Sequence, residues 1–198
     1  LMKPEKDDPA TAETTVELPR EDTRNGLEAA ARGASEGLQL VLNIVAMLIA
    51  FIGLVALANQ IVGWLDHLVN GVGGSVWSLQ AAAGYLFRPA VWLMGVPWHE
   101  TATVGQLMGL KTVLNEFVAY LELARVMQGA QPLGERTFII TSYALCGFAN
   151  FGSVAIMIGG IGGIAPARRA DLARFGLPSL VGGTVATMLT GCVIGIFL

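Results

Sequence analysis

The chain has 198 residues and a net charge of −3, and 54% of its residues are hydrophobic while only 14% are charged. An average soluble domain has roughly 25% charged residues, so this composition argues against an ordinary soluble protein and favours one that lies in a lipid bilayer. The chain also lacks the basic block that would neutralise several phosphates, and we expect no nucleic-acid partner.

The first segment, residues 1–24, mixes Pro, Thr and charged residues with almost no large apolar side chain. Such a segment cannot bury enough surface to offset the entropy lost on ordering, so we predict a solvated linker. It contains no apolar stretch resembling that of a signal peptide. Because Leu1 is not an initiator residue, we expect the chain to be the later part of a longer protein.

Residues 25–37 place Leu27 and several alanines near one helical face, with charged residues at i, i+4 spacing on another. We predict a short cytoplasmic interfacial helix leading into the membrane; a surface helix without membrane contact is the alternative. Residues 37–65 carry no charge. Since about 20 mostly apolar helical residues cross a bilayer core of about 30 Å, residues 38–63 are predicted to form a transmembrane scaffold helix.

The next segment, residues 77–98, is less continuously apolar. It contains four large interfacial aromatic residues: Trp77, Tyr85, Trp92 and Trp98. Such residues gather at membrane–water interfaces, and Pro89 and Pro97 each interrupt helical hydrogen bonding. We therefore predict a helix lying along the outer interface, with a kinked transmembrane span as the alternative.

Basic residues predict the orientation of the chain. Several precede the first span and three arginines separate the last two helices, whereas the connection at residues 66–101 holds only Arg88. The residues before the first span and the connection between the last two helices are therefore predicted to be cytoplasmic. With this orientation, residues 102–127 must begin and end outside. Each arm of that segment has only about a dozen residues, too few to cross, so we predict a re-entrant helical hairpin.

Glu116 lies near the predicted tip of this hairpin, in the sequence GLKTVLNEFVAY. A carboxylate at bilayer depth costs a few kcal/mol even on lenient scales, so intramembrane acids normally face a pathway or a partner. Glu116 is therefore a candidate functional residue. The alternative is an ion pair with Lys111 that holds the hairpin together, although five residues is a poor contact spacing along a helix.

Two further apolar segments complete the chain, at residues 137–163 and 177–198. In the first of them Asn150, Gly152 and Ser153 interrupt an apolar pattern, which predicts a discontinuous transmembrane helix of the kind that transporters use to bind polar solutes. The alternative is ordinary small-residue packing between helices. The last segment is predicted to form the final transmembrane helix, so at least three helices are expected to cross.

The predicted fold class is an all-α integral membrane protein with transmembrane helices, a re-entrant helical hairpin and an unwound, broken helix. An intramembrane enzyme would need a nucleophile with a base, or a metal cluster. The two histidines, His67 and His99, lie in the predicted outer connection, far from Glu116. We therefore expect no enzymatic activity, no cofactor and no metal site in this chain. Cys146 and Cys192 lie in apolar segments, and we expect buried thiols there.

Three motifs carry a family resemblance: GLKTVLNEFVAY, CGFANFGSVAI and GGIGGIAPARR, in this order and spacing. Together they resemble the C-terminal half of the concentrative nucleoside transporters, and LMKPE at the start resembles the end of the helix that precedes the family's cytoplasmic interfacial segment. The resemblance therefore covers nearly the whole chain. It implies a homotrimeric, cation-coupled symporter in which hairpins and unwound helices enclose a nucleoside.

The resemblance also implies the substrate-binding residues. Glu116, with Asn115 in the family's Asn-Glu-Phe motif, would accept hydrogen bonds from ribose hydroxyls. Asn150 and Ser153 would complete the ribose site, and Phe148 would form an apolar wall. A carboxylate, an amide and a hydroxyl together suit vicinal hydroxyl groups. Gly152 stands where many members have a serine.

The family's first hairpin, with the nucleobase contacts and part of the sodium site, would precede residue 1, so this half alone is not expected to transport. Sodium or protons would drive the full transporter, in a multi-pass protein of the bacterial plasma (inner) membrane. The expected partners are a nucleoside, the lipid bilayer, the N-terminal half and two further copies of the chain. A gating or assembly module of the same fold that does not transport is the alternative.

Overall fold

The computed structural model describes residues 25–71 and 78–198. Within these ranges the chain is helical, with no strand. The helices are α1 (Gly26–Asn70), α2 (Leu79–Leu93), α3 (Thr101–Val113), α4 (Glu116–Gln128), α5 (Glu135–Leu145), α6 (Phe151–Ile164), a 3-10 turn η1 (Pro166–Arg168) and α7 (Arg169–Phe197). The linker predicted at residues 1–24 lies outside the described residues.

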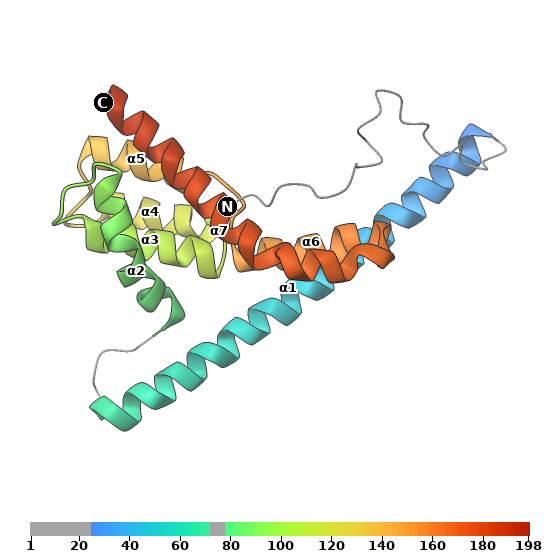
Figure 1. Cartoon of the computed structure of the whole chain (residues 1–198), viewed down its shortest axis with the longest axis horizontal. Coiled ribbons are helices and arrows are strands. Elements are labelled where there is room, and N and C mark those ends of the chain that lie inside the picture. Colours follow the sequence, from blue (N-terminus) through green and yellow to red (C-terminus); the bar gives the residue numbers. More distant parts are fainter. Residues whose placement is uncertain (1–24, 72–77) are drawn as a thin grey trace.

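Helix α1 forms the long axis of the molecule (Figure 1). Asn25 caps its N-terminus by accepting a hydrogen bond from the Glu28 main-chain N at 2.8 Å. The interfacial and transmembrane segments that the sequence divides at residue 37 form one uninterrupted helix of 45 residues. No Pro separates the two segments, and α1 continues through Gly33 and Gly37. Its 45 residues correspond to about 68 Å, longer than a bilayer core.

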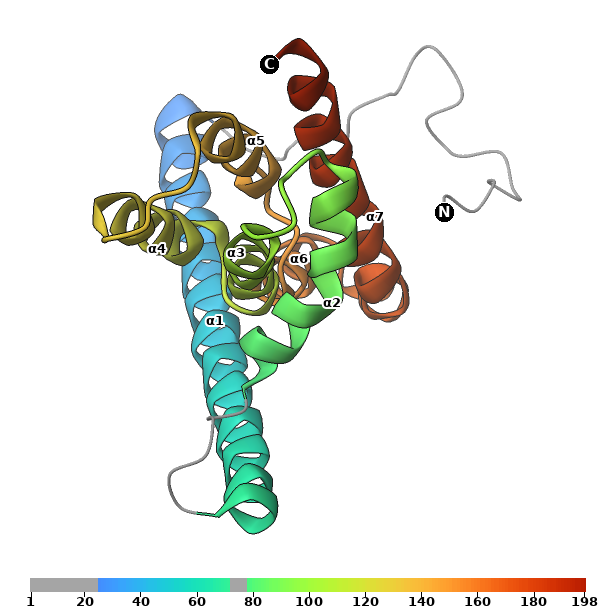
Figure 2. The same cartoon turned by 90° about the vertical axis from the view of Figure 1, so that its left-hand side faces the viewer.

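Helices α2 to α5 pack around the main hydrophobic core of the described chain. Val91 and Met94 from α2 and its end, Leu107 and Met108 from α3, and Ile140 from α5 are all almost fully buried there. In the view of Figure 2, α4 and α7 lie on opposite sides of this group. Helix α2 occupies the middle of the segment predicted to be interfacial, ends before Pro97 and tolerates Pro89 within it.

Helices α2 and α3 approach each other until their main chains touch. A Cβ atom added at Gly109 would lie 2.4 Å from the main-chain O of Gln80, and one at Gly105 would lie 2.6 Å from the main-chain O of Gly84. Only glycine allows this approach, because any other residue would place a side-chain atom inside a neighbouring main-chain group. The position of α3, and hence of its C-terminal end, is therefore fixed against α2.

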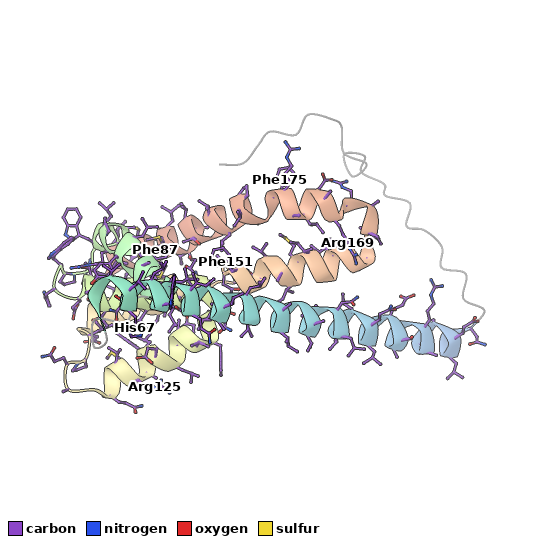
Figure 3. The ribbon with its side chains drawn as sticks, turned by 90° about the horizontal axis from the view of Figure 1, so that it is seen from below. His67, Phe87, Arg125, Phe151, Arg169 and Phe175 are labelled. Carbon is purple, nitrogen blue, oxygen red and sulfur yellow. The ribbon has the colours of Figure 1, made fainter. Side chains whose placement is uncertain are left out.

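Helices α6 and α7 form an antiparallel pair, in which α6 lies along α1 and α7 packs against α6. In Figure 3, Phe151 marks the start of α6 near the α2–α5 group and Arg169 marks the turn into α7 at the far end, where its Nε donates to the Gly162 main-chain O at 2.9 Å. Helix α7 begins eight residues before the predicted residue 177, contains Pro178 and bends along its length (Figure 1).

The described helices include two that are long and apolar enough to cross a membrane, one in α1 and one in η1 with α7. The sequence predicts at least three. The remaining candidate, residues 137–163, is divided by non-helical residues 146–150 into α5 and α6, with 11 and 14 residues. Neither piece alone reaches about 30 Å at 1.5 Å per residue. Both cysteines are free, and Cys146, expected to be buried, is exposed in this non-helical segment.

Candidate functional site

The first element of the site is the turn between α3 and α4, at Leu114 and Asn115. Asn115 has extended main-chain angles, and its side-chain oxygen accepts a hydrogen bond from the main-chain N of Val118 at 2.9 Å. This is the geometry of a helix N-cap, the position that Asn favours. Glu116 is consequently the first residue of α4 and lies at the turn, where its side chain is half-buried.

The second element is the non-helical segment between α5 and α6. Asn150 caps α6: its side-chain oxygen accepts from the Ser153 main-chain N at 2.6 Å, and the Asn150 main-chain N donates to the Ser153 hydroxyl at 3.1 Å. This reciprocal pair is a capping box, which satisfies two free donors at a helix start. Asn150 is only 3% exposed, so its remaining amide hydrogens need partners nearby.

The two elements meet through one hydrogen bond. The Asn150 Nδ2 donates to the Glu116 Oε2 at 2.9 Å, across 34 residues of sequence. The N-termini of α4 and α6 thus converge on the carboxylate of Glu116. A helix N-terminus carries partial positive charge and free N–H groups, so both helix starts attract hydrogen-bond acceptors and negative charge.

Lys111 does not form the direct ion pair with Glu116 that the sequence leaves open. It is fully buried in α3, and its Nζ donates to the Thr187 Oγ1 at 3.0 Å and to the Ala144 main-chain O at 3.4 Å. None of the ion pairs found among the described residues includes it. The structure therefore directs this ammonium group toward α5 and α7 rather than onto the carboxylate.

A cavity of about 420 Å³ lies between α6 and α7. Its walls include Phe148, whose side chain is 79% exposed, together with Ser153 and Thr187. The lining is mostly apolar side chains with a few hydroxyl groups, which is the usual character of a small-molecule site. Asn115, Glu116 and Asn150 do not line this cavity.

The structure thus brings some of the predicted site residues together and leaves others apart. Glu116 contacts Asn150, and Asn150 contacts Ser153. Phe148 and Ser153 share the cavity, while the oxygen of Asn115 is occupied as the cap of α4.

Sequence reasoning missed Thr187, which contacts Lys111 and lines the cavity. Its signal was available in the three-residue spacing of Thr184, Thr187 and Thr190 in the uncharged part of α7. In the part of the chain that the structure describes, no cluster of three or more His, Cys, Asp or Glu side chains could hold a metal ion.

Comparison with protein families gives a match over residues 1–195 to the family described as "Na+ dependent nucleoside transporter C-terminus". The chain is 43% identical over 199 residues to the uncharacterized transporter YutK of Bacillus subtilis, covering 100% of this chain and 48% of that protein. It is 42% identical over 197 residues to sodium/nucleoside cotransporter 1 of Rattus norvegicus, covering 93% of this chain and 30% of that protein. The chain therefore spans less than half the length of these relatives.

Comparison with solved structures also finds proteins with similar helix arrangements. A variant of CNTnw in an outward-facing state matches with a TM-score of 0.82 and 40% identity, covering 91% of this chain and 44% of that one. CNTnw in an inward-facing substrate-bound state matches with a TM-score of 0.65 at the same identity, covering 92% of this chain and 42% of that one. Since the identities are equal, the difference in TM-score indicates that the helices are arranged more like those of the outward-facing variant.

Proposed function

The chain belongs to the concentrative nucleoside transporter family as its C-terminal region, and from this premise we propose that it supplies the ribose-binding side of a nucleoside site in a cation-coupled symporter. The observation that carries the proposal is the hydrogen bond from the Asn150 Nδ2 to the Glu116 Oε2. It places a carboxylate and an amide side by side where two helices begin.

The hydrogen-bonding groups left free at this contact suit a vicinal diol. The Glu116 Oε1 has no hydrogen-bond partner among the described residues, so it is available to accept from a hydroxyl group. The Asn150 Nδ2 carries two hydrogens and uses one of them on Glu116. One ribose hydroxyl can therefore donate to Glu116, and its neighbour can accept the second Asn150 hydrogen.

The other predicted residues take supporting roles in this proposal. Phe148 is exposed at the cavity wall and offers an apolar surface to the sugar or base. The Ser153 hydroxyl donates to the Asn150 main-chain O at 2.6 Å, so toward a ligand it acts as an acceptor. Asn115 uses its oxygen on the α4 cap and keeps its amide hydrogens for substrate.

We further propose that α3 and α4 form a re-entrant hairpin in the membrane. Each helix has 13 residues, or about 20 Å, which is shorter than a bilayer core of about 30 Å. The names of the cotransporter relatives support sodium as the coupling ion of this chain's transporter. Homotrimer assembly and a place in the bacterial inner membrane belong to the same proposal, and transport itself requires a matching N-terminal half.

The experiment expresses the protein from its full coding sequence in a host that lacks nucleoside uptake. Radiolabelled uridine uptake is compared for wild type and Glu116→Gln under imposed sodium or proton gradients. Hydrogen bonds to charged groups contribute about 1.5–3 kcal/mol, so removing one ribose hydroxyl from the substrate is expected to weaken wild-type binding roughly 10- to 100-fold. Glu116→Gln is expected to lower uptake and to shrink this preference for the hydroxyl.

Glu122→Gln provides the matched control on the same helix, because Glu122 pairs with Arg125 at 3.1 Å on the exposed side of α4. It should transport like wild type. If Glu116→Gln transports uridine normally at equal surface amount, the ribose site is refuted. A non-transporting gating or assembly module then becomes the better account of this fold.

A further inference from the structure

Lys111 is a buried cation to which the proposed ribose site assigns no role. Its side chain is fully buried in α3 and is among the largest buried side chains of the described chain. Burying an ammonium group costs several kcal/mol unless hydrogen bonds and an opposite charge compensate it. The ammonium group of Lys111, in the helix leading to the hairpin tip, therefore needs partners that offset this cost.

The hydrogen bonds of Lys111 compensate only part of this cost. Its Nζ donates to the Thr187 hydroxyl and to the Ala144 main-chain O, and both acceptors are uncharged. The Ala144 carbonyl belongs to the last turn of α5, where main-chain carbonyls have no partner within the helix and cations are favoured. Lys111 thus ties α3 to the end of α5, directly before the segment that leads to Asn150.

The opposite charge comes from Glu116. The two side chains lie near the two ends of the α3–α4 turn, close enough for their charges to attract each other without direct contact. The carboxylate instead makes its direct contact with Asn150. This arrangement keeps the second carboxylate oxygen free, whereas a direct ion pair with Lys111 would occupy it.

We propose that Lys111 is a positioning residue for ribose recognition: its charge attracts the Glu116 carboxylate, and its hydrogen bonds to α5 and α7 hold the hairpin tip against Asn150. The inference rests on the proposed function, since it assigns Glu116 to the ribose. Lys111 does not touch the substrate in this account. It sets how strongly the carboxylate binds a hydroxyl group.

The test measures KM and the maximal rate for uridine and for 3′-deoxyuridine in the full-length transporter carrying Lys111→Gln or Lys111→Met. Losing a hydrogen bond to a charged group weakens binding by about a factor of ten or more, and displacement of the Glu116 carboxylate would cause such a loss. The expected result is a KM for uridine raised roughly tenfold and a preference for uridine over 3′-deoxyuridine reduced by a similar factor. The maximal rate per surface transporter should change less.

A purely structural role for Lys111 gives a different pattern, with less protein at the surface or a lower maximal rate while KM and the hydroxyl preference stay at wild-type values. That pattern overturns the inference. If Glu116→Gln alone leaves the hydroxyl preference intact, the ribose site itself fails. If Glu116→Gln removes the preference but both Lys111 variants keep it, only the role of Lys111 fails.

The double variant Lys111→Gln with Glu116→Gln covers the case in which the single variants do not reach the membrane. Removing both charges leaves no unpaired charge in the interior. Recovery of surface expression in the double variant therefore supports the interaction between the two charges. Continued loss of expression means that Lys111 acts as an anchor for α5 and α7 alone, and the inference is overturned.

Discussion

The close contact between α2 and α3 gives a prediction that links stability to the site. In Gly109→Ala the new Cβ would lie 2.4 Å from the Gln80 main-chain O and 2.7 Å from the Gly84 main-chain N. Neither atom belongs to a flexible side chain, so the two helices must move apart. Gly109 lies two residues before Lys111, so the displacement also moves the hairpin tip relative to Asn150.

The magnitude follows from two opposing effects. Replacing Gly by Ala inside a helix gains about 1 kcal/mol of helix propensity, whereas overpacking of a close contact costs about 1–3 kcal/mol and sometimes more. With main-chain atoms at 2.4 Å and 2.7 Å, the cost should exceed the gain. We expect a net loss of about 1–2 kcal/mol, or a melting temperature lowered by several degrees at about 2–4 °C per kcal/mol.

The assay is thermal unfolding of the purified protein in detergent, together with uridine KM in cells. Gly33→Ala is the matched control, because nothing lies within 4 Å of a Cβ atom added at Gly33 in α1. It should be as stable as wild type or slightly more stable. If Gly109→Ala behaves like Gly33→Ala in both measurements, the argument that main-chain contact between α2 and α3 positions the hairpin is refuted.

Two further variants separate binding from stability. Asn150→Ser keeps an oxygen that can cap α6 but removes the amide that donates to Glu116. Uridine KM should therefore rise about 10-fold or more, with little change in melting temperature. An unchanged KM would contradict a ribose site shared by Asn150 and Glu116. The Glu100 carboxylate caps the start of α5, where it accepts from the Gly134 main-chain N at 2.8 Å and from the Thr137 hydroxyl. Glu100→Gln replaces this charged acceptor with a neutral amide. The melting temperature should fall by the equivalent of about 1–2 kcal/mol while uridine KM stays constant, and equal stability would show that this cap contributes nothing.

The sequence alone predicts features that depend on composition and local pattern. The charge-free stretch at residues 37–65 predicts the apolar part of α1, and the all-helical fold class holds for the described residues. The motifs GLKTVLNEFVAY, CGFANFGSVAI and GGIGGIAPARR together predict the family, which the comparison over residues 1–195 confirms. Glu116 stands out because a carboxylate in an apolar segment is expensive wherever the chain folds.

Only the tertiary structure decides which of these residues meet. The contact between Glu116 and Asn150 spans 34 residues, and the contact between Lys111 and Thr187 spans 76. No periodicity within one helix encodes either distance. From the sequence, Glu116 was the one partner that could be considered for Lys111, because it lies nearby in the chain. The hydrogen-bond partners that Lys111 has in the structure depend on how α5 and α7 pack against α3. Local propensity determines where helices begin and end, whereas long-range packing determines which polar groups they bring together.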